Sequence, residues 1–333
     1  MKIAMLIAVT ATTFVLQVGQ TFAQVSGGNY EEDLAEEAVK LDTYIKRLRL
    51  LLAKHGDAGV KSLENQVQFR ISNERVPNAW VVKDPSSGQS TVFMTAEYRL
   101  LITYLADADV ISFTTPGFIQ CRQTYVDALF RALATNRQRS AFGSAPRRLL
   151  APEVYLDAAP AGCREFKGKF PIEPKHRAAR DVAVNTVIAL GYLHELGHVA
   201  LGHAGVSLAS IEALPTNSMR LNEFVQLMRR SRVQEFQADD WAIDRFVDLS
   251  NNPLEALTNV LSTFYLAFGG FDCSLEAADS HPNGFQRFAR QMTRLKARAT
   301  ASGKFPNNAD VAKLIDDTTA LASKAQQNLK CPI

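Results

Sequence analysis

The chain has 333 residues, enough for one large domain with a substantial hydrophobic core. Its 37 Lys and Arg residues nearly balance its 34 Asp and Glu residues, and no long run of like charge occurs, so the composition gives no support for nucleic-acid binding. Beyond the N-terminal segment, no apolar run is long enough to cross a membrane.

The first residues have the pattern of a secretory signal peptide. Lys2 supplies a short positive region, residues 3–18 are largely apolar, and Thr21-Phe22-Ala23 approximates a small-x-small cleavage site. We therefore predict a signal peptide at residues 1–23 and one exported domain at residues 24–333, periplasmic or secreted and with no transmembrane segment after cleavage. No cysteine directly follows the apolar stretch, so lipid anchoring is not expected; an uncleaved membrane anchor is the alternative.

The next part of the chain is predicted to combine helices with a small sheet. Residues 30–54 repeat apolar side chains between charges at helical spacing. Strands are expected at residues 67–71, 79–82 and 91–94, and the last two form a hairpin around a turn rich in Pro, Ser and Gly. The edge of such a hairpin can bind an extended peptide as an added strand.

The middle of the chain is predicted to be less regular. Helices are expected at residues 97–105 and 125–134, and five prolines make residues 143–175 rich in loops.

The cysteine count suggests disulfides. Cys121, Cys163, Cys273 and Cys331 all follow the signal peptide, and an even number in an exported chain favours two bridges, with three pairings possible. We favour Cys121–Cys163 and Cys273–Cys331. A zinc–thiolate site is the competing interpretation, but no C-x-x-C spacing supports it.

A helical segment at residues 181–201 contains the sequence His194-Glu195-Leu196-Gly197-His198. Histidines four residues apart lie on one helix face, so both imidazoles can bind the same ion. Glu195 points about 100° around the helix and can reach a water on that ion without being a ligand. This H-E-x-x-H spacing is typical of a zinc peptidase.

The alternative for this segment is a pair of surface histidines on an ordinary helix. The segment is largely apolar, and buried histidine and glutamate side chains must find polar partners, which favours a metal. The residues expected on the opposite, apolar face are Ala189, Leu193, Leu196 and Ala200.

A catalytic zinc ion needs a third protein ligand. His203 is nine residues after His194 and half a turn out of phase, so we interpret it as a residue at the C-terminal end of the helix, near Gly202 and Gly205.

Glu235 is the better candidate for the third ligand. In a second helix, expected at residues 218–247, Glu235 and Asp239 lie four residues apart on one face. Glu235 can complete the zinc site, and Asp239 can hold the outer nitrogen of a ligand histidine. The alternative is a solvated acidic face of the helix.

The remaining segments complete the expected fold. Residues 205–217 link the two metal-bearing helices and could act as a lid, and further helices are expected at residues 253–267, 284–299 and 310–329. The prediction is an α+β domain that is mostly helical and has a small sheet.

Four motifs occur in order along the chain. They are Pro77-Asn78-Ala79-Trp80, H-E-x-x-H, the E-x-x-A-D sequence from Glu235 to Asp239, and Ser280-His281-Pro282 followed by Arg287. The ordered set resembles the HtpX/CAAX-protease-like family of gluzincin zinc peptidases, with their N-A-F, H-E-x-x-H, E-x-x-A-D and T-H-P…R motifs.

The resemblance implies a zincin-type metallopeptidase domain with one Zn²⁺ per chain, held by His194, His198 and Glu235. It assigns His281 and Arg287 to the stabilisation of the oxyanion or of the acidic zinc site, and Asn78 to substrate binding at the rim. The alternative for His281 is a histidine at a helix start, and for Arg287 it is a surface arginine. The alternative for Asn78 is a turn residue after Pro77.

The chain departs from the family pattern in one interval. Residues 81–193 separate the N-A segment from H-E-x-x-H, and a Cys-containing insertion around residues 106–176 lies between them. The topology of this interval and the shape of the substrate cleft are therefore left open.

The predicted activity is zinc-dependent hydrolysis of peptide bonds in exported proteins or peptides. Glu195 would act as the general base, and His281 would assist at the oxyanion. One alternative is a periplasmic chaperone or quality-control adaptor on the same scaffold. The other is a structural domain with an incidental motif.

Overall fold

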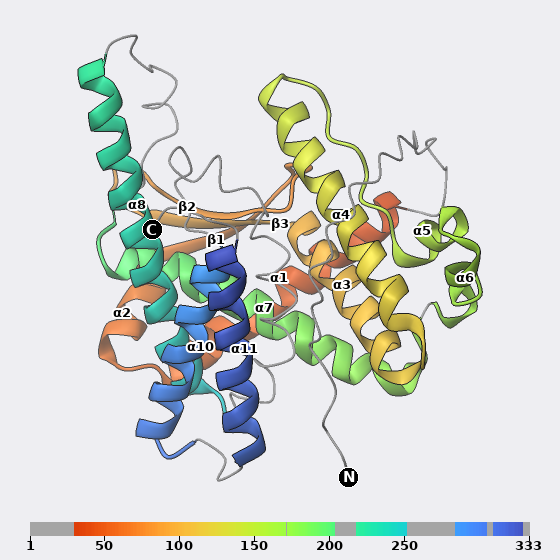
Figure 1. Ribbon diagram of the computed structural model, residues 1–333. Coiled ribbons are helices and arrows are strands. Elements are labelled where there is room, and N and C mark those ends of the chain that lie inside the picture. Colours follow the sequence, from red (N-terminus) through yellow and green to blue (C-terminus); the bar gives the residue numbers. More distant parts are fainter. Residues whose placement is uncertain (1–29, 171, 204–217, 252–283, 305–308, 329–333) are drawn as a thin grey trace.

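The computed structural model describes residues 30–170, 172–203, 218–251, 284–304 and 309–328 (Figure 1). Several sequence predictions lie outside these residues. They are the signal peptide at residues 1–23, the possible lid at residues 205–217, the helix at residues 253–267, and the side chains of Cys273, His281 and Cys331.

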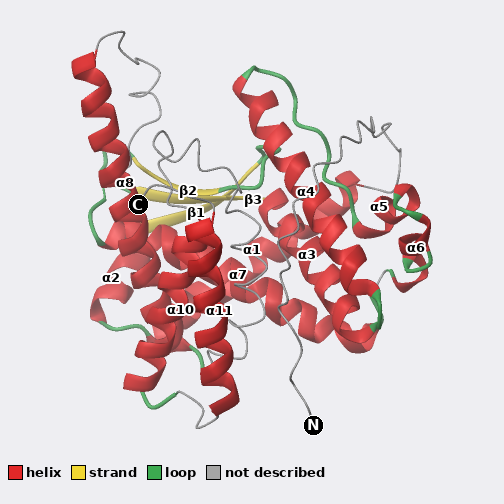
Figure 2. Ribbon diagram, in the orientation of Figure 1, coloured by secondary structure: helices red, strands yellow, loops and turns green. Residues whose placement is uncertain are grey.

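The described residues are mostly helical and include one small sheet, which agrees with the predicted α+β class (Figure 2). The strands are β1 (Val67–Ser72), β2 (Ala79–Lys83) and β3 (Ser90–Thr95). The helices are α1 (Tyr30–His55), α2 (Ala58–Gln66), α3 (Ala96–Thr114), α4 (Phe118–Ala141), α5 (Pro152–Ala158), α6 (Ala161–Arg164), α7 (Pro174–Ala200), α8 (Ser218–Leu249), α10 (Gly284–Ala301) and α11 (Ala309–Asn328).

Several expectations about helices need correction, and one of them is the helix predicted at residues 125–134, which extends over Phe118–Ala141. Helix α3 continues nine residues past the predicted end at residue 105, because it is buried on nearly all sides and has no polar face to mark where it stops. The predicted loop region contains the short helices α5 and α6, and α2 was not predicted at all. Helix α2 is only nine residues long and is capped by the preceding Asp57, whose carboxylate accepts a hydrogen bond from the Val60 amide.

The sheet has the strand order β1-β3-β2. Strand β3 pairs in parallel with β1 and antiparallel with β2, which confirms the predicted hairpin. The turn between β2 and β3 is closed by hydrogen bonds between Asp84 and Gln89 and from the Gly88 amide to Asp84, and Gly88 has the positive φ that this turn requires. Strand β2 therefore lies at an edge of the described sheet.

Helix α7 crosses the middle of the molecule, with α8, α10 and α11 on one side and α3 to α6 on the other (Figure 1). One hydrophobic cluster joins the sheet to α1, α7, α8 and α10, and it includes Met94, Leu193 and Leu196. Ala189 is also buried, as predicted, but Ala200 is exposed because α7 ends at that residue. This cluster fixes α7 and α8 against each other.

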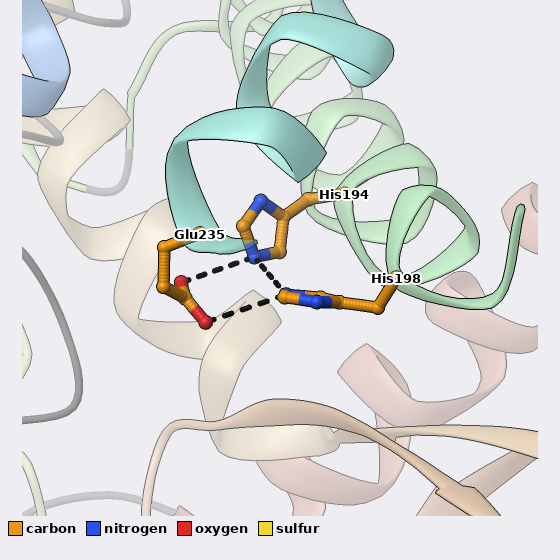
Figure 3. Close-up of side chains that lie close together, drawn as sticks. All are labelled: His194, His198 and Glu235. Carbon is orange, nitrogen blue, oxygen red and sulfur yellow. Dashed lines mark hydrogen bonds and ion pairs between the residues drawn. The ribbon is translucent and has the colours of Figure 1, made fainter. Parts of the chain in front are cut away.

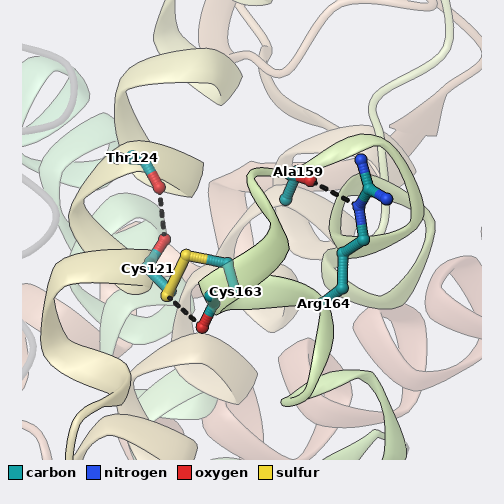
Figure 4. Close-up of a disulfide and its surroundings, with 6 residues drawn as sticks. Cys121, Thr124, Ala159, Cys163 and Arg164 are labelled. Carbon is teal, nitrogen blue, oxygen red and sulfur yellow. Dashed lines mark hydrogen bonds between the residues drawn. A yellow bond between two sulfur atoms is a disulfide. The ribbon is translucent and has the colours of Figure 1, made fainter.

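A second hydrophobic cluster fills the space between α3, α4, α5 and α6. Cys121 of α4 and Cys163 of α6 form a disulfide within it, which is the pairing expected from the sequence (Figure 4). Among the described residues, no helix combines the length and the apolar character that a membrane span requires.

Candidate metal centre

Three helices contribute to one polar cluster inside the molecule. Helix α7 carries His194 and His198, α8 carries Glu235 and Asp239, and α10 carries Arg287. Helices α7 and α8 approach closely because Gly197, inside the H-E-x-x-H sequence, has no side chain to separate it from Ala238. The close crossing brings the two polar helix faces together.

His194, His198 and Glu235 lie together, and each offers a possible ligand atom within 4.8 Å of those of the other two residues (Figure 3). The Nε2 atoms of the two histidines are 3.1 Å apart; that of His194 lies 3.3 Å from Oε2 of Glu235, and that of His198 lies 3.3 Å from Oε1. Ligands of a tetrahedral zinc ion, with bonds of ~2.0–2.1 Å, are separated by roughly 3.3 Å. Two imidazole nitrogens and a carboxylate at these separations can hold a metal ion.

The outer nitrogen of His194 contacts Asp239. The Nδ1 atom lies 2.8 Å from Asp239 Oδ1, and Arg287 donates to both oxygens of the same carboxylate, with Nε at 2.8 Å and Nη2 at 2.6 Å. Asp239 is only 2% exposed, so this two-bond pairing compensates a charge that water cannot reach. Asp239 thereby holds the His194 ring with Nε2 directed at the proposed ligand position.

The charges in this cluster shift the pKa values of its members. Burial disfavours a charged His194, but Asp239 and Glu235 outweigh burial and raise the pKa of His194 to about 10. Burial would raise the pKa of Asp239, but Arg287 and His194 hold it below its usual range. Glu235 faces Nε2 of His194, where its charge would attract either a proton or a divalent cation, so the metal and a proton compete for that nitrogen.

Sequence reasoning missed the place of His203. The residue is not part of the helix end but follows it, and its Nδ1 atom lies 3.0 Å from Nδ1 of His198. On its other side, Nε2 lies 3.0 Å from the side-chain oxygen of Gln237. Gly202, two residues after the last residue of α7, was the available signal, because a glycine there turns the chain back over the helix end.

The remaining predicted site residues have different positions. Glu195 follows His194 on α7 and is buried. Asn78 is exposed and directly precedes strand β2; its amide donates to the Thr95 hydroxyl, and its carbonyl accepts from the Thr95 amide. Arg287 is not a surface arginine, since it contacts Asp239 inside the cluster.

Comparisons with protein-family models, with curated proteins and with solved structures find no match to this chain. The resemblance to gluzincin peptidases therefore rests on the motifs in the sequence.

Proposed function

We propose that this protein is an exported zinc-dependent metalloendopeptidase. The observation that carries the proposal is the cluster of His194, His198 and Glu235, which come from two helices and offer possible ligand atoms within 4.8 Å of one another, with the buried Glu195 next to His194 in the sequence. Two histidines and one carboxylate are a ligand set of catalytic zinc sites that keep a fourth position open.

Zinc at this site would supply a Lewis acid and lower the pKa of water to about 7. Glu195 is the only acidic residue between the two histidines, and its carboxylate can accept a proton from the attacking water. The protonated Glu195 can then give that proton to the departing amine, so the same group serves as base and as acid.

Strand β2 is the proposed place for the substrate. It lies at an edge of the described sheet, follows Asn78 directly, and packs near α7. An extended peptide added along this edge would form backbone hydrogen bonds, with little dependence on its side chains. This mode suits an enzyme that cleaves unfolded segments of exported proteins.

Export is proposed from the N-terminal pattern and from the Cys121–Cys163 bridge. Disulfides persist in oxidising compartments such as the periplasm and the extracellular space, and are rare in the cytosol.

The test combines metal analysis with cleavage assays on an unfolded reporter protein. We expect one zinc per chain and loss of cleavage in Glu195→Gln, with zinc retained because Glu195 is not a ligand. Glu173→Gln, an exposed position just before the same helix, is the matched control and should cleave normally. Cleavage by the Glu195→Gln protein would refute the peptidase mechanism. A protein that retains a substrate-protecting function in this variant would be a chaperone or adaptor.

A further inference from the structure

Two residues outside the predicted ligand set, His203 and Gln237, form a chain of hydrogen-bonding groups that ends at His198. The ring nitrogens of His198 and His203 face each other through their Nδ1 atoms at 3.0 Å, and His203 Nε2 lies 3.0 Å from Gln237 Oε1. Gln237 is two residues after Glu235, so helix α8 supplies both the third ligand and the end of this chain.

The end of helix α7 positions His203. The Gly202 amide donates to the Val199 carbonyl and the His203 amide donates to the His198 carbonyl, at 3.1 and 3.0 Å. Gly202 has a φ of 66°, so these two hydrogen bonds form a Schellman motif that folds the chain back over the last turn. His203 therefore forms hydrogen bonds with His198 through both its backbone amide and its ring.

The direction of the hydrogen bonds follows from Gln237. Its side-chain oxygen can only accept, so the Nε2 atom of His203 must carry the proton. A neutral His203 with its proton on Nε2 has a bare Nδ1, which accepts from Nδ1–H of His198. The Nε2 atom of His198 is then bare as well, and it is the atom that lies 3.3 Å from Glu235.

We propose that His203 and Gln237 are positioning residues that select the His198 tautomer able to bind a metal through Nε2. This inference rests on the proposed zinc site and extends it. The charged pair of Asp239 and Arg287 orients the His194 ring in the same way, whereas two neutral side chains orient His198. The two ligand histidines are thus oriented by partners of different charge.

The test measures the zinc affinity of the purified protein by competition with a chelator at fixed pH. In His203→Leu the acceptor is lost while a side chain of similar bulk remains, and the affinity should fall by about 10- to 100-fold, the usual effect of losing such a partner. His203→Asn should stay within about threefold of the original protein, because the asparagine oxygen replaces Nδ1 as the acceptor. His176→Asn, at the start of α7, is the control and should bind zinc normally.

A double variant tests the role of Gln237. Gln237→Leu should weaken zinc binding severalfold in the original protein. It should have no effect in the His203→Asn background, where the hydrogen bond from residue 203 to Gln237 is already lost. In zinc-loaded protein with ¹⁵N-labelled histidine, the NMR spectrum should show His198 with a protonated Nδ1 and a coordinated Nε2.

The outcomes separate the two proposals. If the original protein binds zinc and His203→Leu binds it equally well, the positioning role is wrong and the zinc site stands. If His203→Asn is as weak as His203→Leu, a hydrogen-bond acceptor at residue 203 does not restore zinc binding, and the positioning role is again wrong. If the original protein binds no zinc, the proposed function falls and this inference falls with it.

Discussion

Gly197 packs directly against the backbone of Ala238 where helices α7 and α8 cross. A Cβ atom at residue 197 would come within 3.1 Å of the Ala238 carbonyl oxygen and 3.2 Å of its Cα atom. These neighbours are backbone atoms of a long helix, which cannot rotate away as a side chain can. The glycine within H-E-x-x-H thus sets how closely Glu235 approaches the two histidines.

Gly197→Ala should lower the zinc affinity clearly while changing the stability of the metal-free protein less. Gly197→Ala should move α8 outward by a few tenths of an ångström, which exceeds the ~0.2 Å tolerance of zinc–ligand distances. We expect the zinc affinity to fall by about tenfold or more, on the scale known for displaced partners of ligands. Alanine's higher helix propensity, worth about 1 kcal/mol, offsets part of the packing cost in the metal-free protein.

Zinc titration and thermal unfolding of Gly197→Ala would check this prediction. Gly162→Ala is the matched control, because a Cβ atom at residue 162 meets nothing within 4 Å. An unchanged zinc affinity in Gly197→Ala would show that the crossing distance does not control the site.

Arg287 should contribute far more to stability than the other arginines of α10. It pairs with the buried carboxylate of Asp239, and Arg287→Met would remove this partner and leave the contact with His194, at a cost of up to about 3–5 kcal/mol. Arg294 pairs with Asp244 at the surface, so Arg294→Met should cost about 0.2–1 kcal/mol. Denaturant unfolding with a chelator present measures both. Equal losses of unfolding free energy in the two variants would mean that Arg287 contributes no more than an arginine of a surface ion pair.

The stability of the protein should depend on pH through Asp107 of α3. Burial raises the pKa of Asp107 from 3.8 to about 7, with Glu153 of α5 and Glu37 of α1 adding to the shift and Arg180 of α7 opposing it. Because the folded protein then binds a proton that the unfolded chain has lost, this group destabilises the fold progressively as the pH rises from about 4 to about 7.

Asp107→Asn should remove this dependence. The free energy of unfolding of the original protein relative to the variant should fall by up to about 4 kcal/mol across that pH range. Denaturant unfolding at several pH values measures it, with Asp157→Asn, an exposed position, as the control. If the free energy of unfolding depends on pH in the same way in the original protein and in Asp107→Asn, the raised pKa of Asp107 is wrong.

Breaking the disulfide should destabilise the region of α3 to α6 without weakening the metal site. The bridge joins residues with a sequence separation of 42. By restricting the unfolded chain, a loop of this length stabilises the folded protein by about 4 kcal/mol. Cys121 and Cys163 belong to the second hydrophobic cluster, whereas the metal cluster lies on α7, α8 and α10. We therefore expect the double Cys→Ser variant at these residues to melt earlier and to bind zinc with unchanged affinity.

Unfolding and zinc titration of that variant test the separation of the two regions. Non-reducing peptide mapping of the original protein checks the pairing itself. A matching loss of zinc affinity would show that the second cluster supports the metal site.

Several features of the site followed from local sequence. The 3.6-residue period of a helix places His194 with His198, and Glu235 with Asp239, on common faces wherever these helices lie. The alternation and turn residues around Asp84 likewise predicted the β2–β3 hairpin, since strand and turn preferences act over a few residues. Helix α3 was harder to delimit, because a helix buried on nearly all sides carries no polar period.

Ion pairs between distant segments illustrate what local sequence could not determine. Asp240, Asp244 and Asp248 of α8 pair with Arg290, Arg294 and Arg298 of α10, always fifty residues later, so the two helices run in parallel with a fixed register. This register brings Arg287 to Asp239.

The sequence by itself determined which residues share a helix face and which chemistry those faces carry. Only the tertiary structure decided that the faces of α7 and α8 meet, that His203 turns back onto His198, and that Arg287 reaches Asp239. The physical reason is that these contacts join residues on different helices or beyond a helix end. Their distances depend on side-chain packing, such as Gly197 against Ala238, rather than on the preferences of neighbouring residues.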